Sequence, residues 1–113
     1  MNFCPVCGAR LKAASAAVSR MIEDYRKRIS TSPEDADAHY NLALAYLEAK
    51  EDGLAEVELR RVIELEPGFA DAHLRLASIY LGRGEREKAR KELQKALVAE
   101  PNNPAAREML ERL

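Results

Sequence analysis

The chain has 113 residues, of which 47% are hydrophobic, 33% are charged and only 5% are aromatic, and its net charge is −1. This length suits one small domain with a modest core. No apolar stretch is long enough to cross a bilayer, so we expect no membrane association. The near-balanced charge and the scarcity of aromatic side chains argue against nucleic-acid binding. The first residues lack the apolar core of a secretory signal, and we therefore expect a cytoplasmic protein.

Residues 1–12 contain the only motif with the chemistry of a metal site. Cys4-Pro5-Val6-Cys7-Gly8 resembles the knuckle of zinc ribbons and rubredoxin-like sites. A closed zinc site needs four ligands, and the chain has no second cysteine pair. Cys4 and Cys7 are therefore expected to bind zinc only in a site shared between two chains, with a flexible relic tail as the alternative. Thioredoxin-like redox chemistry is disfavoured because it needs a βαβ scaffold.

Charge is distributed unevenly along the chain. Residues 1–33 hold six basic and two acidic side chains, whereas residues 34–58 hold eight acids and one base. Solvated helix faces explain such a pattern, and so does electrostatic attraction between the basic segment of one chain and the acidic segment of another. Both interpretations remain open on the sequence.

Residues 13–32 are expected to form a helix. Its apolar positions are Met21, Ile22, Tyr25 and Ile29, at the spacing of one helical face. By register, this helix corresponds to the second half of a repeat whose first helix is missing. Met21, Ile22 and Tyr25 should then have an uncovered side, which predicts a homodimer formed through this helix.

The segments 36–69 and 70–103 are two copies of one pattern. Residues 36–39, Ala-Asp-Ala-His, recur 34 residues later as residues 70–73, and such a period indicates a helical-repeat architecture. Apolar spacing predicts helices over 36–49, 53–66, 70–83 and 87–99, with Asp35 or Asp37 at the start of the first. Apolar positions of the second of these helices include Leu54 and Leu59. Small residues should let paired helices approach closely, namely Ala43, Ala55, Ala77 and Ala89.

A last helix is expected over 104–113, opened by Pro104. Its apolar side carries Met109, Leu110 and Leu113, and its outer side carries Glu108, Glu111 and Arg112. This polar outer side suits a capping helix at the end of a repeat array.

The repeated residues closely resemble the tetratricopeptide repeat (TPR), a helix–turn–helix of 34 residues. The first copy matches at His39, Leu42, Ala43, Tyr46, Ala55, Leu59 and Pro67, and the second at His73, Leu76, Ala77, Tyr80, Ala89, Leu93 and Pro101. Histidine stands where tryptophan is commonest. The resemblance implies an all-α, TPR-like helical-hairpin solenoid of about six helices. Its parts would be a half repeat (13–35), two repeats (36–69 and 70–103) and a capping helix (104–113).

In TPR proteins the first helix of each repeat lines the partner-binding groove. Carried over by position, this implies a groove formed by Asp37, Tyr40, Asn41, Leu44, Glu48, Asp71, Leu74, Arg75, Ser78, Leu81, Ala105, Glu108 and Arg112. Leu44, Leu74 and Leu81 should be exposed in a lone monomer unless neighbouring helices cover them in part. Asn41 and Arg75 match two positions of the clamp that grips chaperone C-terminal tails. Asp71 replaces a lysine of that clamp, so we do not expect chaperone-tail binding.

These features favour a non-catalytic scaffold that binds a protein or peptide partner. The alternative is a self-assembling module closed by exchange of half repeats or by shared zinc. An enzyme is disfavoured, because the chain has no nucleophile-elbow motif and no glycine-rich phosphate loop. His39 and His73 occupy the same position in the two repeats, which favours packing in the core over a role as catalytic bases.

Overall fold

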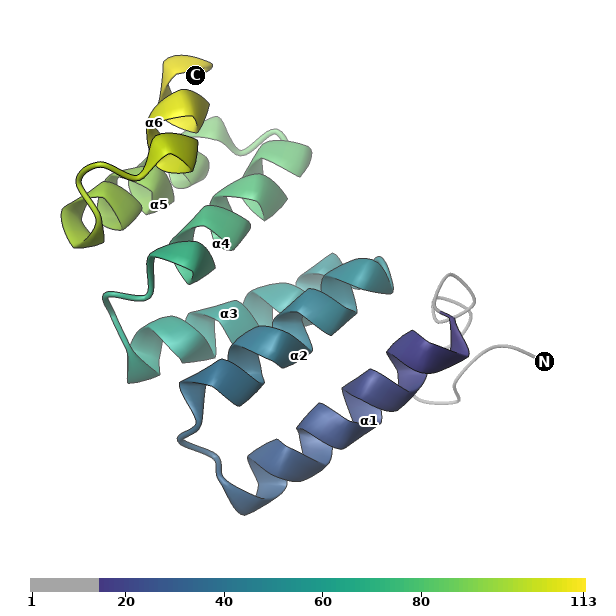
Figure 1. Ribbon diagram of the computed structural model, residues 1–113. Coiled ribbons are helices and arrows are strands. Elements are labelled where there is room, and N and C mark those ends of the chain that lie inside the picture. Colours follow the sequence, from purple (N-terminus) through teal and green to yellow (C-terminus); the bar gives the residue numbers. More distant parts are fainter. Residues whose placement is uncertain (1–14) are drawn as a thin grey trace. The chain divides into compact units, whose positions relative to one another are not determined.

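The computed structural model describes residues 15–113 and contains six α-helices in that range (Figure 1). The helices are α1 (Ala16–Thr31), α2 (Ala36–Glu48), α3 (Asp52–Leu65), α4 (Ala70–Gly82), α5 (Arg86–Ala99) and α6 (Pro104–Glu111). Each lies within a few residues of its predicted range, and no strand occurs in the described part. None of these helices is long and apolar enough to cross a membrane. The chain divides into two compact units, with the boundary between Arg61 and Val62 inside α3.

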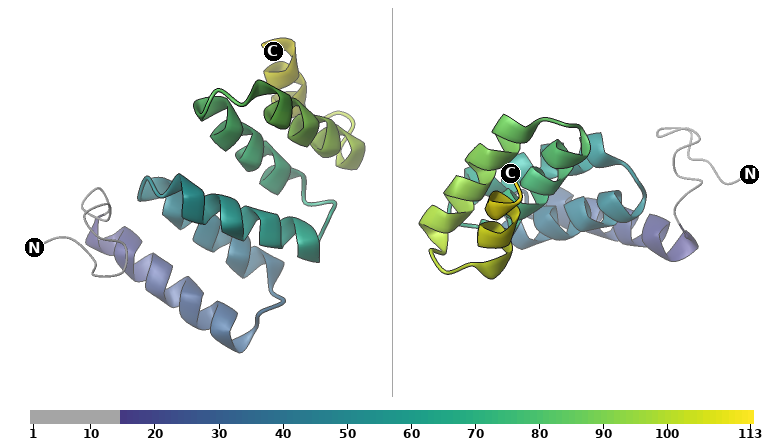
Figure 2. Two further views of the ribbon diagram at one scale, coloured as in Figure 1. Left: turned by 180° about the vertical axis from the view of Figure 1, so that it is seen from behind. Right: turned by 90° about the horizontal axis from the view of Figure 1, so that it is seen from above.

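In the first unit, α1, α2 and α3 lie side by side and run in alternating directions (Figures 1 and 2). The Ser15 hydroxyl accepts a hydrogen bond from the amide of Val18, and the Asp35 carboxylate accepts one from the amide of Ala38 at 3.1 Å. These caps satisfy amides that have no partner within the helix. The buried core takes a residue from each helix, including Ile22, Leu42 and Leu59.

Two expectations for this unit were wrong. Ile22 was expected to have an uncovered side, yet it is buried, because α1 packs against α2. Leu54 was expected on the apolar face of its helix but is 38% exposed, because it lies in the first turn of α3, away from the fully buried Ala55 and Leu59. Met21 is 43% exposed, as the incomplete first repeat predicts.

In the second unit, α4 and α5 form an antiparallel hairpin and α6 packs on α5 (Figure 2). Ala77 and Ala89 are completely buried, which allows the two helices of the hairpin to approach closely. The Asn103 side chain accepts a hydrogen bond from the amide of Ala106, and Pro104 occupies the first turn of α6. This short helix therefore has a defined start despite its eight residues.

The turns within the two hairpins repeat each other in detail. Lys50 and Gly84 both have positive φ, 63° and 78°. In each turn the next amide donates to a tyrosine carbonyl at 2.8 Å, Glu51 to Tyr46 and Glu85 to Tyr80. A left-handed residue after a helix lets the chain turn back while the last carbonyls stay bonded, and glycine adopts that conformation without steric cost.

Candidate functional site

Each repeat contains a buried histidine held between a proline carbonyl and a glutamate, an arrangement that we call the His–Glu clasp. His39 Nδ1 lies 2.6 Å from Glu58 Oε1, and its Nε2 lies 2.9 Å from the carbonyl oxygen of Pro33. In the second repeat, His73 Nδ1 lies 2.8 Å from Glu92 Oε1, and Nε2 lies 3.1 Å from the carbonyl oxygen of Pro67. The clasp therefore ties the first helix of a repeat to its second helix and to the preceding turn.

Both ring nitrogens of these histidines face acceptors. A carbonyl oxygen can only accept, so Nε2 donates to the proline carbonyl. An imidazolium can donate from Nδ1 to an ionised glutamate as well, which makes a charge-assisted hydrogen bond. The exposed fractions of His39 and His73 are 6% and 2%. The arrangement satisfies every polar atom of a buried ring, as a structural role requires.

The contact with His73 changes the pKa of Glu92. Burial acts to raise the pKa of Glu92, but the hydrogen bond from His73 and the positive charges of Lys95 and His73 outweigh it, so its pKa is lowered from 4.5. Lys95 Nζ lies 3.7 Å from the other carboxylate oxygen. Glu92 is therefore held as a carboxylate in the folded chain.

The geometry of the clasps fits a structural role. Neither histidine nor its glutamate lines either of the two hollows described below. The hydrogen bonds of each clasp join the histidine ring to a glutamate of the second helix and to the carbonyl of the preceding proline. Packing of His39 and His73 in the core, which the repeat phase predicted, is confirmed.

The exposed side of α2 carries the groove residues predicted for the first repeat. Tyr40, Asn41 and Leu44 are half-buried, whereas Asp37 and Glu48 are exposed. They recur at the three- and four-residue spacing of one helical face. Leu44 is thus partly covered rather than fully exposed, which answers one of the alternatives left open by the sequence.

The corresponding side of α4 has the same character in the second unit. Leu74 and Leu81 are half-buried, and Asp71, Arg75 and Ser78 are exposed. The predicted residues of α6, which are Ala105, Glu108 and Arg112, are also exposed. An aliphatic side chain beside polar ones on a single face is a composition suited to contacting a polypeptide.

The second unit contains an open hollow of about 410 Å³ with apolar walls and two arginines, which we call the basic hollow. It is lined by Leu81, Gly84, Arg86, Met109, Arg112 and Leu113. A guanidinium nitrogen of Arg86 donates to the carbonyl oxygen of Leu113 at 3.1 Å, which ties the start of α5 to the end of the chain beyond α6. Arg112 forms an ion pair with Glu108 at 2.6 Å.

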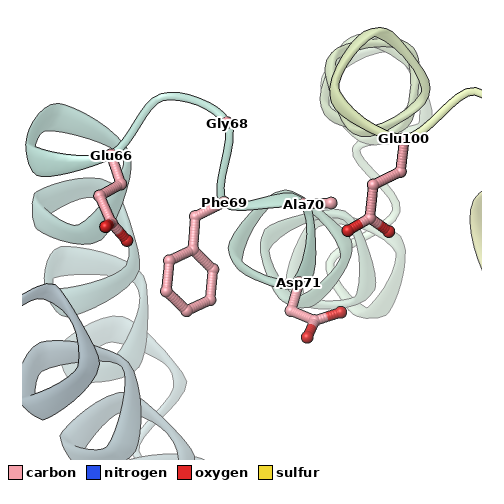
Figure 3. A pocket seen from close by; sticks show the side chains of 6 residues that line it. All are labelled: Glu66, Gly68, Phe69, Ala70, Asp71 and Glu100. Atoms are coloured by element: carbon pink, nitrogen blue, oxygen red, sulfur yellow. The ribbon is translucent and has the colours of Figure 1, made fainter.

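A second open hollow, of about 440 Å³, carries carboxylates and is called here the acidic hollow. It is lined by Glu66, Gly68, Phe69, Ala70, Asp71 and Glu100. Figure 3 shows the Phe69 ring between Glu66 and Asp71, with Glu100 beyond Ala70. The lining contains no basic side chain.

The structure brings three predicted groove residues into hollows: Leu81 and Arg112 in the basic one and Asp71 in the acidic one. Sequence reasoning did not assign Arg86, Glu66 or Glu100 to a site. Glu66 and Glu100 occupy the same position in the two repeats, which was a usable signal. Cys4 and Cys7 lie outside the described residues, and within residues 15–113 no group of three potential metal ligands occurs.

Comparison with known proteins agrees with this architecture. Two family models described as tetratricopeptide repeat match residues 53–113 and residues 9–68. No curated protein matches the sequence.

Among solved structures, the chain is similar to the first TPR of Spaghetti (RPAP3) bound to an HSP90 peptide, with 25% identity and a TM-score of 0.79 over 85% of this chain and 76% of that one. The second TPR domain of human RPAP3, in complex with an HSP70 peptide, gives 26% identity and a TM-score of 0.77 over 84% and 79%. MamA gives 30% identity and a TM-score of 0.74, over 76% of this chain and 50% of that one. With two in-phase helical hairpins and family models that together span the described helices, this chain belongs to the tetratricopeptide repeat family.

Proposed function

We propose that this chain is a non-catalytic interaction scaffold that binds a protein or peptide partner along the exposed faces of α2 and α4. The observation that carries the proposal is that each face presents half-buried leucines beside polar side chains, Leu44 with Asn41 on α2, and Leu74 and Leu81 with Ser78 on α4. Aliphatic groups that are partly accessible among polar neighbours favour contact with another polypeptide. The similar TPR structures that contain chaperone peptides support binding of this general kind.

Chaperone tails are not the partner that we propose. Those tails end in a carboxylate and carry acidic side chains, as the sequence SRMEEVD in one similar structure illustrates. Asp71 is exposed on the α4 face and would repel such a ligand. We therefore expect a partner segment with apolar side chains and without a cluster of carboxylates.

The test is capture of partners from a lysate with the immobilised chain, compared with two variants. Leu44→Asp places a charge in the middle of the α2 face and should abolish specific capture. Leu54→Asp makes the same change at an exposed position on α3 and should leave capture intact. If Leu44→Asp captures the same proteins as the unaltered chain, or if nothing specific is captured at all, the proposal fails.

Self-association through α1 is a second candidate function, favoured by one observation. Met21, a large apolar side chain of α1, is 43% exposed on the helix that the sequence predicts to lack a partner. We propose a homodimer through this helix, with Cys4 and Cys7 of both chains completing a zinc site. Light scattering of the unaltered chain should then give twice the chain mass, and Met21→Glu should give a monomer. Metal analysis should find one zinc per two chains, removed by Cys4→Ser together with Cys7→Ser.

A further inference from the structure

The two hollows of the second unit carry opposite charge. The basic hollow is lined by Arg86 and Arg112 among apolar side chains and has no Asp or Glu side chain in its lining. The acidic hollow is lined by three carboxylates and Phe69 and has no basic side chain. One chain therefore presents both halves of an electrostatically complementary contact.

The arginines of the basic hollow can change partners at small cost. The Arg112–Glu108 ion pair joins side chains that are 75% and 62% exposed, and such a pair contributes little to stability. Arg86 donates to an oxygen of Leu113, the last residue of the given sequence, and forms no ion pair with an Asp or Glu side chain of residues 15–113. Between the arginines, Leu81, Met109 and Leu113 form an accessible apolar floor, since all three are half-buried.

The acidic hollow includes a turn with the complementary side chains. Glu66, Pro67 and Gly68 are exposed, and Phe69 follows them as a half-buried ring. No basic group of residues 15–113 lies within ion-pair distance of Glu66 or Asp71, and the Glu100 carboxylate accepts a hydrogen bond from the Asn103 side chain. The acidic hollow, of which this turn forms one side, therefore presents carboxylates beside an aromatic ring, as Figure 3 shows.

We propose that the rim of the acidic hollow of one copy, formed by the turn Glu66–Phe69 together with Asp71 and Glu100, docks into the basic hollow of a second copy. The carboxylates would pair with Arg86 and Arg112, and Phe69 would lie against the apolar floor. The contact joins two different patches of the same chain, so it is heterologous and propagates head to tail into short open chains. A contact limited to these few residues is weak, and it is salt-sensitive because charge dominates it. The contact uses Leu81 and Asp71 of the α4 face, so it would compete with partner binding there, whereas the α2 face takes no part in it.

Sedimentation velocity tests the proposal on the full chain carrying Met21→Glu, which removes association through α1. This parent chain also carries every further change below. At about 100 μM protein and about 50 mM NaCl, the weight-average mass should rise with protein concentration, and it should return to the monomer value at about 500 mM NaCl. A control variant, Lys91→Glu with Arg107→Glu, reverses two positive charges at exposed positions that line neither hollow. It should associate like the parent chain. Circular dichroism confirms that each variant is folded.

Two blocked variants make the test specific. Arg86→Glu with Arg112→Glu reverses the basic hollow, and Glu66→Lys with Glu100→Lys reverses two charges of the acidic one. Each should be monomeric alone, and an equimolar mixture should associate again, because the intact acidic hollow of one variant meets the intact basic hollow of the other. A parent chain that is monomeric under these conditions overturns the proposal, and so does a mixture that stays monomeric. Association that survives in both blocked variants assigns the contact to another surface and also overturns it.

Discussion

At the residue scale, one position of the repeat carries a hydrogen-bonded histidine in both copies, where tryptophan is commonest. His39 and His73 are buried as the repeat phase predicts, but each also fastens a turn and two helices through its ring nitrogens. The polar ring thus contributes a directional constraint where tryptophan would contribute volume. The cost of burying it is offset only while both nitrogens have partners.

Glu92→Gln should destabilise the chain at neutral pH by about 1–3 kcal/mol, because it removes a charge-assisted hydrogen bond to a buried ring. The pKa of Glu92 is lowered in the folded state. Its stabilisation is therefore fully present above the unfolded-state pKa and is lost as the pH falls through the lower folded-state pKa. The difference between the unaltered chain and the variant should shrink as the pH falls below about 4.5. Urea unfolding at a series of pH values measures this.

Glu108→Gln is the matched control for that measurement. Its ion pair with Arg112 is exposed on α6, so the free energy of unfolding should change by no more than about 0.5 kcal/mol at any pH. Equal destabilisation by Glu92→Gln at pH 7 and at pH 3 would show that the carboxylate charge does not act as described.

The sequence predicted the burial of the histidines but not their partners. Periodicity places a residue on a helical face, whereas the contact of His73 with Glu92 joins residues 19 apart on different helices. Glu58 and Glu92 do occupy the same position in their repeats, so the repeat itself contained the signal. The groove side chains show a further limit. Their face was predictable, but the half-burial of Leu44 depends on neighbouring side chains that the sequence does not order in space.

At the element scale, helix starts and stops follow local chemistry, and for that reason the six helices were predictable. Asp35 and Asn103 cap α2 and α6, and prolines precede α2, α4 and α6 or open them. The exact turn geometry was not predictable from residue type alone, because Lys50 adopts the left-handed conformation that Gly84 adopts in the second repeat. The turn's hydrogen bonds to the tyrosine carbonyls hold Lys50 there.

Gly84→Ala and Gly82→Ala should have opposite effects on stability. Gly84 has a φ of 78°, so a Cβ there costs about 1 kcal/mol despite the open space around it. Gly82 is the last residue of α4 and also faces open space, and there alanine should stabilise the helix by about 0.5–1 kcal/mol. Thermal unfolding followed by circular dichroism compares the two. A gain in melting temperature for Gly84→Ala would contradict the turn geometry.

The close approach of α4 and α5 leads to a second prediction at the scale of the helices. Ala89 is completely buried between the helices of this hairpin. Ala89→Leu should lower the free energy of unfolding by about 1–3 kcal/mol, because the larger side chain forces the helices apart. Ala99→Leu, at an exposed position near the end of α5, should change it by less than about 0.5 kcal/mol. Similar melting curves for the two variants would mean that Ala89 is not at a tight contact.

At the scale of the whole molecule, repetition explains both the fold and the surface. Two copies of one hairpin bury the same positions and expose the same faces, so a residue assigned in one repeat has a counterpart in the other. Fold class followed from the period, and the family models agree. The identity of the partner did not follow, because a helical face specifies a type of contact rather than a particular ligand. The zinc hypothesis for Cys4 and Cys7 stays a prediction.

Methyl NMR tests the central claim most directly. With leucine and valine methyl groups labelled, a segment of a captured partner is titrated into the full chain. The account predicts chemical-shift changes at Leu44, Leu74 and Leu81, and unchanged signals from Leu54, which is exposed on α3, and Leu93, which is fully buried. Changes confined to Leu54 and the exposed valines Val57 and Val98, with the α2 and α4 leucines unaffected, would contradict partner binding along these faces.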